Sequence, residues 1–416
     1  MIKKYLVNLS KKNVWLRKIF RFLIYVKNKI MYSYYYLFYK VSPKMILFES
    51  FYGNSYSCSP KAIYEYMLTD ERFKDFTFVW AFKEPNKYSF DERTILVKSN
   101  SRRYYKYLSK SKYWIVNLLI NTGVKKKKNQ VYVQCWHGTP LKKLRYDIEK
   151  DNILNSVSEV RKRNDLDAIK FDYFISPSKF CTEKFTSAFN LKNLNKENIF
   201  IEKGYPRNDY LFNYKKSDVK KIKKELNIPL NKKVILYAPT FRDNQVNENG
   251  YTYNVVLDFE KLKKEISDEY VVLFRAHYFI ANKFNFDKYN GFVYNVSKYE
   301  DINELYIISD LLITDYSSVF FDFANLKRPE LFYMYDYDDY KNNLRDFYIS
   351  LKELPGPIVQ SEEELIDEIK KIDSYNKKYK IKYENFNKKY NYLDDGNSAK
   401  RVVEEIFNEN RIKKEN

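Results

Sequence analysis

From residue 45 onward the chain alternates short apolar runs with longer stretches whose apolar residues recur at helical spacing. The first series is rich in β-branched and aromatic residues: MILFES (45–50), FTFVWA (76–81), TILV (94–97), YWIVN (113–117), VYVQC (131–135), FDYFIS (171–176) and NIFIE (198–202). A second series follows a lysine-rich stretch: VILYA (234–238), YVVLF (270–274), LLIT (311–314) and ELFY (330–333). Strands that alternate with helices predict an α/β protein with parallel sheets, and the two series predict two domains, 45–210 and 211–416.

Residues 1–44 have a different pattern, with no acidic residue and eleven lysines and arginines up to Lys44. Apolar residues recur there at helical spacing: Leu16, Ile19, Phe20, Leu23, Val26 and Ile30. The longest uncharged run is 30–39, 10 residues, whereas a membrane-spanning helix needs about 20. The segment therefore predicts a basic amphipathic helix that lies on an anionic membrane surface. The alternative is a helix that packs its apolar stripe on the protein's own core.

The composition narrows the classes of protein to consider. The 416 residues include 75 Lys plus Arg and 54 Asp plus Glu, a net charge of +21, yet 44% of the residues are apolar and 19% aromatic. This apolar content excludes a disordered polycation. The sequence contains no GxGxxG and no GxxxxGK[ST] motif, and its three cysteines have neither disulfide-framework nor metal-knuckle spacing. We therefore expect a protein of a reducing cytosol with no structural metal.

Only two histidines are present, so any imidazole chemistry falls to His137 or His277. His137 follows the run VYVQC within the turn WHGTP, beside Gly138 and Thr139. His277 follows the run YVVLF, two residues after Arg275. Ligands of open α/β sheets bind beyond the carboxyl ends of strands, and both histidines lie at such ends. A lone histidine is more often a hydrogen-bonded structural residue, and that alternative stays open for each.

Hydroxyl and basic side chains follow two further strands. Thr240 and Arg242 come after VILYA, and Asp315, Ser317 and Ser318 come after LLIT at the start of an apolar helical pattern. Together with Arg275 and His277, these residues predict a site for a phosphate dianion, in which side chains and helix dipoles stabilise the charge. The alternative for Asp315 and the two serines is simple capping of the helix.

Two other charged motifs each allow two interpretations. The acidic run 336–339 resembles a divalent-metal motif of some sugar transferases, but it follows a short strand late in the chain. The lysine run 125–128 could touch nucleic acid, but it falls between predicted strands and favours a solvated loop.

Taken together, the motifs resemble those of the CDP-glycerol glycerophosphotransferase family of teichoic-acid biosynthesis. The resemblance spans about residues 46–372 and rests on six segments in order: VYVQCWHGTPLKKL, FDYFISPSKFCTEKF, KGYPRNDYLF, ILYAPTFRDN, VLFRAH and DINELYIISDLLITDYSSVFFDFANLKRP. It implies a GT-B-like fold, with two Rossmann-like domains facing a cleft. It also implies catalytic roles for His137 and His277. The substrate-binding residues that it implies are Gly138, Thr139, Thr240, Arg242, Arg275, Asp315, Ser317 and Ser318.

The resemblance further implies the reaction. Glycerol 3-phosphate passes from CDP-glycerol to a hydroxyl of a polyprenyl diphosphate-linked saccharide or polyol-phosphate chain, and CMP is released. No cofactor, metal or nucleic acid is implied, and the enzyme would be peripheral on the cytoplasmic face of the membrane. Three questions stay open: whether the polyol is glycerol or ribitol, whether the enzyme is a primase or a polymerase, and whether the polymer is teichoic acid or capsule. The alternatives are a GT-B glycosyltransferase that uses a nucleotide sugar and a basic nucleic-acid-binding protein.

Overall fold

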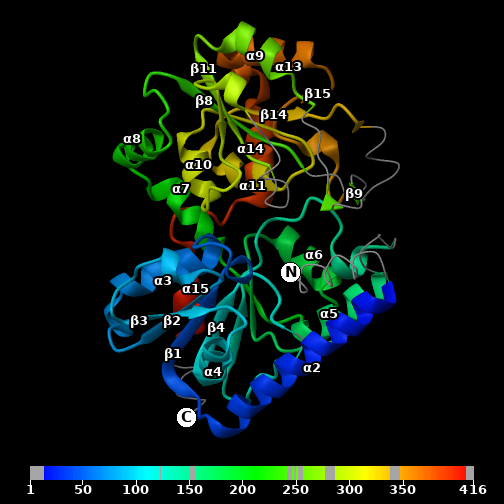
Figure 1. Cartoon of the computed structure of the whole chain (residues 1–416). Coiled ribbons are helices and arrows are strands. Elements are labelled where there is room, and N and C mark those ends of the chain that lie inside the picture. The colour runs from blue at the N-terminus through cyan, green and yellow to red at the C-terminus, as the bar shows by residue number, and fades with distance from the viewer. Residues whose placement is uncertain are drawn as a thin grey trace. The chain divides into compact units, whose positions relative to one another are not determined.

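The computed structural model describes residues 14–121, 123–149, 156–240, 246–247, 250–251, 256–276, 286–337 and 347–408. These residues form two compact units that are interleaved along the chain (Figure 1). The described residues of unit 1 fall within Met1–His137, Lys150–Ile175 and Phe189–Ile201, and those of unit 2 within Gly138–Glu149, Ser176–Ala188 and Glu202–Asn416. The division of the chain into domains at residue 210 stays a prediction.

Unit 1 is built around a sheet with the strand order β3-β2-β1-β4-β5-β6-β7 in the described part of the chain. The pairs from β3 through to β6 are parallel. The strands are β1 (Ser42–Glu49), β2 (Thr77–Phe82), β3 (Thr94–Lys98), β4 (Ser111–Val116), β5 (Val131–Gln134), β6 (Tyr173–Ser176) and β7 (Phe200–Glu202). Consecutive residues in β1, β2 and β4 are buried, as expected for parallel strands covered on both faces. Its helices after the N-terminal one are α3 (Cys58–Thr69), α4 (Arg102–Lys110) and α5 (Val157–Ala168).

Unit 2 has a second parallel sheet, with the order β12-β11-β8-β13-β14-β15. Its strands are β8 (Lys233–Ala238), β11 (Tyr270–Phe274), β12 (Val293–Asn295), β13 (Leu311–Thr314), β14 (Glu330–Tyr333) and β15 (Ile358–Val359). A short antiparallel pair, β9 (Val246–Asn247) and β10 (Gly250–Tyr251), lies outside it. The helices are α6 (Lys179–Ala188), α7 (Asp209–Asn213), α8 (Lys216–Glu225), α9 (Phe259–Ile266), α10 (Ile302–Ile308), α11 (Val319–Phe323), α13 (Glu362–Lys370), α14 (Tyr375–Tyr390) and α15 (Ser398–Ile406).

Both sheets have the same topology, which locates the place where each can bind a ligand. Counted from its own first strand, each sheet begins 3-2-1-4-5-6, the Rossmann order. The order reverses between the first and fourth strands, and ligands bind beyond the carboxyl ends of the strands at that switch point. In unit 1 this point lies between β1 and β4, and in unit 2 between β8 and β13. The predicted fold class of two Rossmann-like parallel-sheet units is therefore confirmed.

The N-terminal helix, α2 (Val14–Phe38), runs for 25 residues and packs on unit 1 (Figure 1). The Tyr32 side chain is buried, and its hydroxyl donates to the carbonyl of Lys125 at 2.6 Å. Ser109 Oγ in α4 donates to the Tyr35 carbonyl at 2.8 Å. Lys127 Nζ donates to the carbonyl of Tyr39. Part of the lysine run 125–128 thus holds α2 in place.

Candidate functional site

The switch point of unit 1 carries three residues that contact one another: Phe51 after β1, Asn117 after β4 and His137 after β5. Asn117 is fully buried, and its Oδ1 atom accepts the backbone N–H of Phe51 at 2.8 Å. The Nδ1 atom of His137 lies 3.0 Å from the backbone carbonyl oxygen of Asn117. His137, for which the resemblance implies a catalytic role, therefore lies at the edge of the sheet where ligands bind in this topology.

Two aromatic rings fix the orientation of the His137 imidazole. The Trp136 ring lies 4.1 Å from it between centroids, and the Phe51 ring meets it edge-on at 5.8 Å. Trp136 has a left-handed backbone, with φ of 50°, a conformation that costs a non-glycine residue about 1–2 kcal/mol. Strain of this kind persists only where the surroundings hold the backbone. The strand thus ends in a tight turn immediately before the histidine, as the WHGTP pattern predicts.

Gly138 and Thr139 continue this turn into unit 2. A β-carbon at residue 138 would lie 3.3 Å from Ser318 Oγ and 3.4 Å from Arg207 Nη2. Thr139 is buried, and its hydroxyl oxygen lies 3.6 Å from Cys181 Sγ. The residue after His137 therefore lies against the predicted phosphate-binding residue Ser318.

The switch point of unit 2 joins two other predicted site residues. Asp315, which follows β13, accepts the backbone N–H of Thr240 with Oδ1 at 2.7 Å, and it also accepts the N–H of Tyr316 at 2.6 Å. The neighbouring Thr314 hydroxyl donates to the carbonyl of Ala238 at the end of β8. These bonds tie the two strand ends together, so Asp315 shapes the loop that carries Thr240.

Ser317 and Ser318 are half-buried on the turn between β13 and α11. Ser317 Oγ accepts the N–H of Val319 at 3.5 Å, whereas the Ser318 side chain makes no capping hydrogen bond. Helix α11 has only five residues, so a helix dipole is a weak source of charge stabilisation here. The serine hydroxyls themselves are the better candidates for contact with a phosphate.

Arg275, predicted to bind an anion, is occupied by backbone groups. Its Nη1 atom donates to the carbonyls of Val296 at 3.1 Å and Tyr299 at 2.7 Å, and burial lowers the pKa of the guanidinium. It therefore holds the segment after β12 against β11, and its role in substrate binding stays a prediction. Arg242 and His277 lie outside the described residues, so their predicted roles also stay predictions.

The family assignment follows from comparison with known proteins. The family model of the CDP-glycerol:poly(glycerophosphate) glycerophosphotransferases matches residues 30–408. The chain belongs to this family. The resemblance expected from the motifs is thereby confirmed.

Relatives in this family act in teichoic acid synthesis. The teichoic acid poly(glycerol phosphate) polymerase of Bacillus spizizenii is 43% identical over 88% of this chain and 92% of its own. The teichoic acid glycerol-phosphate transferase of Staphylococcus aureus is 41% identical over 87% and 92%. The chain spans only about half, 49%, of the poly(glycerol phosphate) polymerase of Bacillus subtilis, which is 43% identical.

A solved wall teichoic acid polymerase has the same fold. The wall teichoic acid polymerase TagF, in a histidine variant soaked with CDPG, aligns with a TM-score of 0.85 and 37% sequence identity. The alignment covers 96% of this chain and 98% of that one. The GT-B-like assignment of the fold is thereby confirmed.

Sequence reasoning missed a buried polar network in unit 2 of this chain. Arg207 Nη2 donates to both carboxylate oxygens of Asp322 at 2.7 and 2.6 Å, and the two side chains are 8% and 6% exposed. Asn208 Nδ2 bridges Asp322 Oδ1 and Asp394 Oδ2. Burial raises the pKa of the Asp394 carboxyl to about 7. The network holds Arg207 beside Gly138, and its only sequence signal was the KGYPRND segment.

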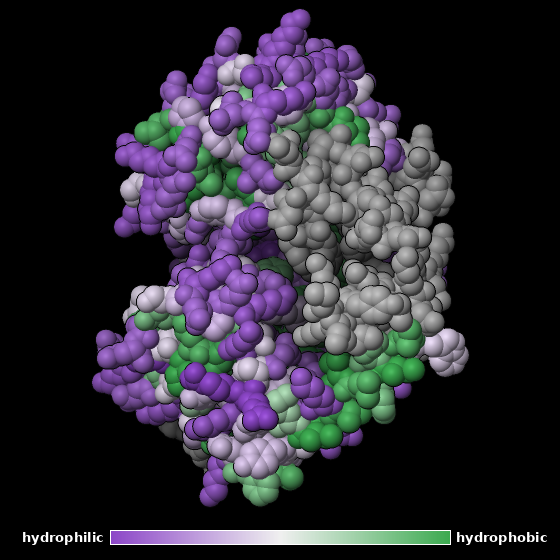
Figure 2. Space-filling model, in the orientation of Figure 1, coloured by the Kyte–Doolittle hydropathy of each residue, from purple (hydrophilic) through white to green (hydrophobic). Residues whose placement is uncertain are grey.

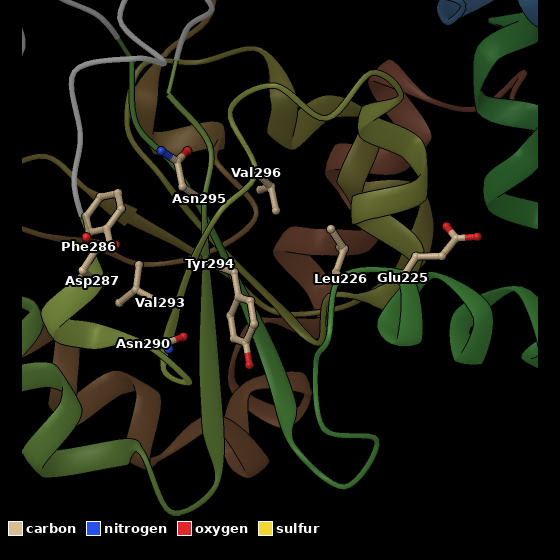
Figure 3. A pocket seen from close by; sticks show the side chains of 9 residues that line it. All are labelled: Glu225, Leu226, Phe286, Asp287, Asn290, Val293, Tyr294, Asn295 and Val296. Carbon is tan, nitrogen blue, oxygen red and sulfur yellow. The ribbon is translucent and has the colours of Figure 1, made fainter. Parts of the chain in front are cut away.

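The described part of the chain also has a cavity whose lining includes Val296, the residue whose carbonyl accepts from Arg275. It has a volume of about 600 Å³ and lies along the edge strand β12 and the end of α8 (Figure 3). Its lining residues are Glu225, Leu226, Phe286, Asp287, Asn290, Val293, Tyr294, Asn295 and Val296. None of these nine described residues is a predicted site residue, and none of the nine carries a positive charge. Within the described ranges, no three His, Cys, Asp or Glu side chains are grouped so that they could hold a metal ion.

Proposed function

We propose that this chain transfers glycerol 3-phosphate from CDP-glycerol to a hydroxyl of a lipid-linked acceptor and releases CMP. The observation that carries the proposal is the placement of His137 at the switch point of unit 1, with Nδ1 hydrogen-bonded to a backbone carbonyl. A carbonyl can only accept, so Nδ1 carries the proton and Nε2 of the neutral ring carries the lone pair. That is the state a general base requires.

The reaction then proceeds as a displacement at phosphorus. His137 Nε2 takes the proton of the acceptor hydroxyl as the oxygen attacks the β-phosphorus of CDP-glycerol. A new phosphorus–oxygen bond forms to the acceptor, and the bond from the β-phosphorus to the bridging oxygen breaks. CMP leaves with that oxygen and its electron pair. The protein contributes positioning and charge stabilisation, as is usual for phosphoryl transfer.

Unit 2 supplies the proposed donor-binding residues. Ser317 and Ser318 offer hydroxyl donors for the phosphate oxygens, and Asp315 holds the Thr240 loop beside them through the 2.7 Å bond. Gly138 allows the backbone of the WHGTP turn to approach Ser318. We expect Arg242, Arg275 and His277 to contribute positive charge, because two anionic substrates must be brought together.

We further propose that the enzyme binds the cytoplasmic face of the membrane through α2, where a lipid-linked acceptor would lie. Half of the predicted stripe is exposed: Ile19, Leu23 and Ile30 are 52%, 54% and 68% exposed, whereas Leu16, Phe20 and Val26 are half-buried. Other large apolar side chains of α2 are exposed as well: Trp15, Phe22, Ile24, Tyr34, Leu37 and Phe38. Figure 2 shows hydrophobic residues gathered over part of α2, interrupted by more hydrophilic ones.

Large contiguous apolar patches are rarely left exposed to water in soluble proteins. Lys27, Lys29 and Lys40 are exposed beside the apolar residues of α2 and would attract anionic headgroups. Among the described residues, no helix is long and apolar enough to cross a bilayer.

The donor assignment is tested by supplying CDP-glycerol, CDP-ribitol and a panel of UDP-sugars with a lipid-linked acceptor. The proposal expects CMP release and a mass increase of one or more glycerol phosphate units with CDP-glycerol. Transfer of a sugar from a UDP-sugar, with CDP-glycerol inert, would favour the glycosyltransferase alternative. The number of units added separates a primase from a polymerase.

A further inference from the structure

We propose that Asn117 is the positioning residue for His137. Its backbone carbonyl sets which imidazole nitrogen carries the proton, and its side chain fixes that carbonyl by binding the chain after β1. The inference rests on the proposed role of His137 as a base. It assigns a function to a buried residue that lies 20 positions from the histidine in sequence.

The ends of strands β1 and β4 lie side by side and are joined by Asn117. β1 and β4 are neighbours in register, with Glu49 opposite Val116. The chain leaves β1 through Phe51 and Tyr52, which have left-handed φ values of 49° and 57°. Such residues cost of order 1–3 kcal/mol each unless their surroundings hold them. The 2.8 Å bond from the Phe51 N–H to Asn117 Oδ1 is one contact that does so.

Asn117 also links the end of β1 to the His137 imidazole. The same residue that receives the Phe51 N–H on its side chain receives His137 Nδ1 on its carbonyl, at 3.0 Å. Phe51 in turn places its ring edge-on against the imidazole, 5.8 Å between centroids. Asn117 therefore contacts the histidine directly and also holds the ring that packs beside it.

An asparagine at residue 117 lowers the stability of the folded state. Asn117 is 0% exposed, and its Nδ2 atom has no hydrogen-bond partner among the described residues. An unsatisfied buried donor costs about 1–3 kcal/mol. A group kept at such a cost calls for an explanation. The bond from the Phe51 N–H to the side-chain oxygen, which holds in place the residue whose carbonyl meets His137, provides one.

The chemical consequence concerns the proton. A carbonyl that accepts Nδ1–H leaves the lone pair on Nε2, and it stabilises the imidazolium that forms when Nε2 takes a proton. Without the contacts that Asn117 makes, the imidazole can exchange tautomers or rotate. A misplacement of a catalytic group by about 1 Å can lower the rate about 100-fold.

The experiment reads the tautomer directly. Because the sequence has only two histidines, ¹⁵N-histidine labelling gives spectra that can be assigned with a His277→Gln variant. In the full-length enzyme we expect His137 to be protonated on Nδ1. In Asn117→Ala we expect a mixture of tautomers, a kcat about 10- to 100-fold lower and a KM for CDP-glycerol within twofold of the original.

Two variants separate positioning from folding. Asn117→Asp keeps an acceptor oxygen for the Phe51 N–H and should retain the Nδ1-protonated tautomer. Asn121→Ala is the matched control, because Asn121 bonds Asn100 and Tyr105 instead, and it should leave both tautomer and kcat unchanged. If Asn117→Ala does not fold, Asn117→Ser, with a shorter acceptor, replaces it with the same expectations.

The inference is overturned if His137 is protonated on Nε2 in the original enzyme. It is equally overturned if the Ala or Ser variant keeps the Nδ1 tautomer and full kcat. Absence of CMP release by the original enzyme would instead refute the proposed function, and the tautomer measurement would still stand on its own.

Discussion

Gly138 lies against Ser318 so closely that a β-carbon at residue 138 would be 3.3 Å from the serine Oγ. Gly138 directly follows the proposed base, and Ser318 is a proposed ligand of the donor phosphates. Since consecutive Cα atoms are about 3.8 Å apart, the chain itself ties the proposed base to the residue that packs on the proposed phosphate-binding turn.

Gly138→Ala should reduce activity while leaving the fold intact. The added methyl group must displace Ser318 or Arg207 by a few tenths of an ångström, and small errors of position are costly in catalysis. We expect kcat/KM for CDP-glycerol to fall about 10-fold or more, with an unchanged melting temperature. Full activity of Gly138→Ala would show that the close approach has no catalytic importance.

The Arg207–Asp322 pair should matter mainly for stability. Both side chains are buried, and removal of one partner leaves the other as an uncompensated charge. We expect Arg207→Ala to lower the free energy of unfolding by about 3–5 kcal/mol in urea denaturation. Lys44→Ala is the control, because its pair with Asp75 is exposed and should change little. Equal effects of the two substitutions would contradict this account.

Glu49 should make unit 1 less stable as the pH rises towards neutrality. Burial raises the pKa of its carboxyl to about 7, although bonds from Ser99 and Tyr104 oppose the shift. The unfolded chain loses this proton near pH 4.3, so between about pH 4 and 7 the folded state binds more protons than the unfolded state. Stability from this group is therefore present at low pH and is lost as the pH rises through 7.

Glu49→Gln, which stays neutral, tests this dependence. We expect urea denaturation at pH 5, 6, 7 and 8 to show a flatter pH dependence in the variant, with a gain over the original of about 1–3 kcal/mol at pH 8. The exposed Glu363→Gln should leave the profile unchanged. If the free energy of unfolding fell more steeply with rising pH in the Gln variant, the carboxylate would be the stable buried form of Glu49.

The exposed face of α2 should control binding to membranes. Replacing Ile19, Phe22 and Ile30 together by serine removes apolar area that would otherwise leave water. We expect binding to vesicles containing anionic lipid, measured by co-sedimentation, to weaken at least 10-fold. Ile381→Ser changes an isoleucine that is 74% exposed on α14 and should have no effect. Unchanged binding of the triple variant would exclude α2 as the membrane contact.

The sheets could be predicted from sequence because parallel strands covered on both faces are continuous apolar runs. The short strands β12 and β15 were not predicted, whereas β7, which also has three residues, was predicted within the longer run 198–202. Because ligands bind beyond the carboxyl ends of parallel strands, Thr240 and Asp315 were predicted to share one site. The two residues are 75 positions apart in the sequence, and they are directly hydrogen-bonded. Their proximity could be predicted because both residues follow strands of the same parallel sheet.

The remaining parts of the site could not be predicted, for two physical reasons. Arg207 and Asp322 are 115 residues apart, and a buried ion pair leaves no periodic pattern in either segment. The contact of Asn117 with His137 uses a backbone carbonyl, a group that every residue possesses. Only the folded arrangement of β1, β4 and β5 reveals which carbonyl the histidine meets.

The central claim, that His137 is the base for glycerophosphate transfer, is tested most directly by CMP release from CDP-glycerol with a lipid-linked acceptor. For His137→Ala the account predicts a loss of turnover of at least about 100-fold, with CDP-glycerol binding by calorimetry nearly unchanged. Turnover equal to that of the original enzyme would contradict it.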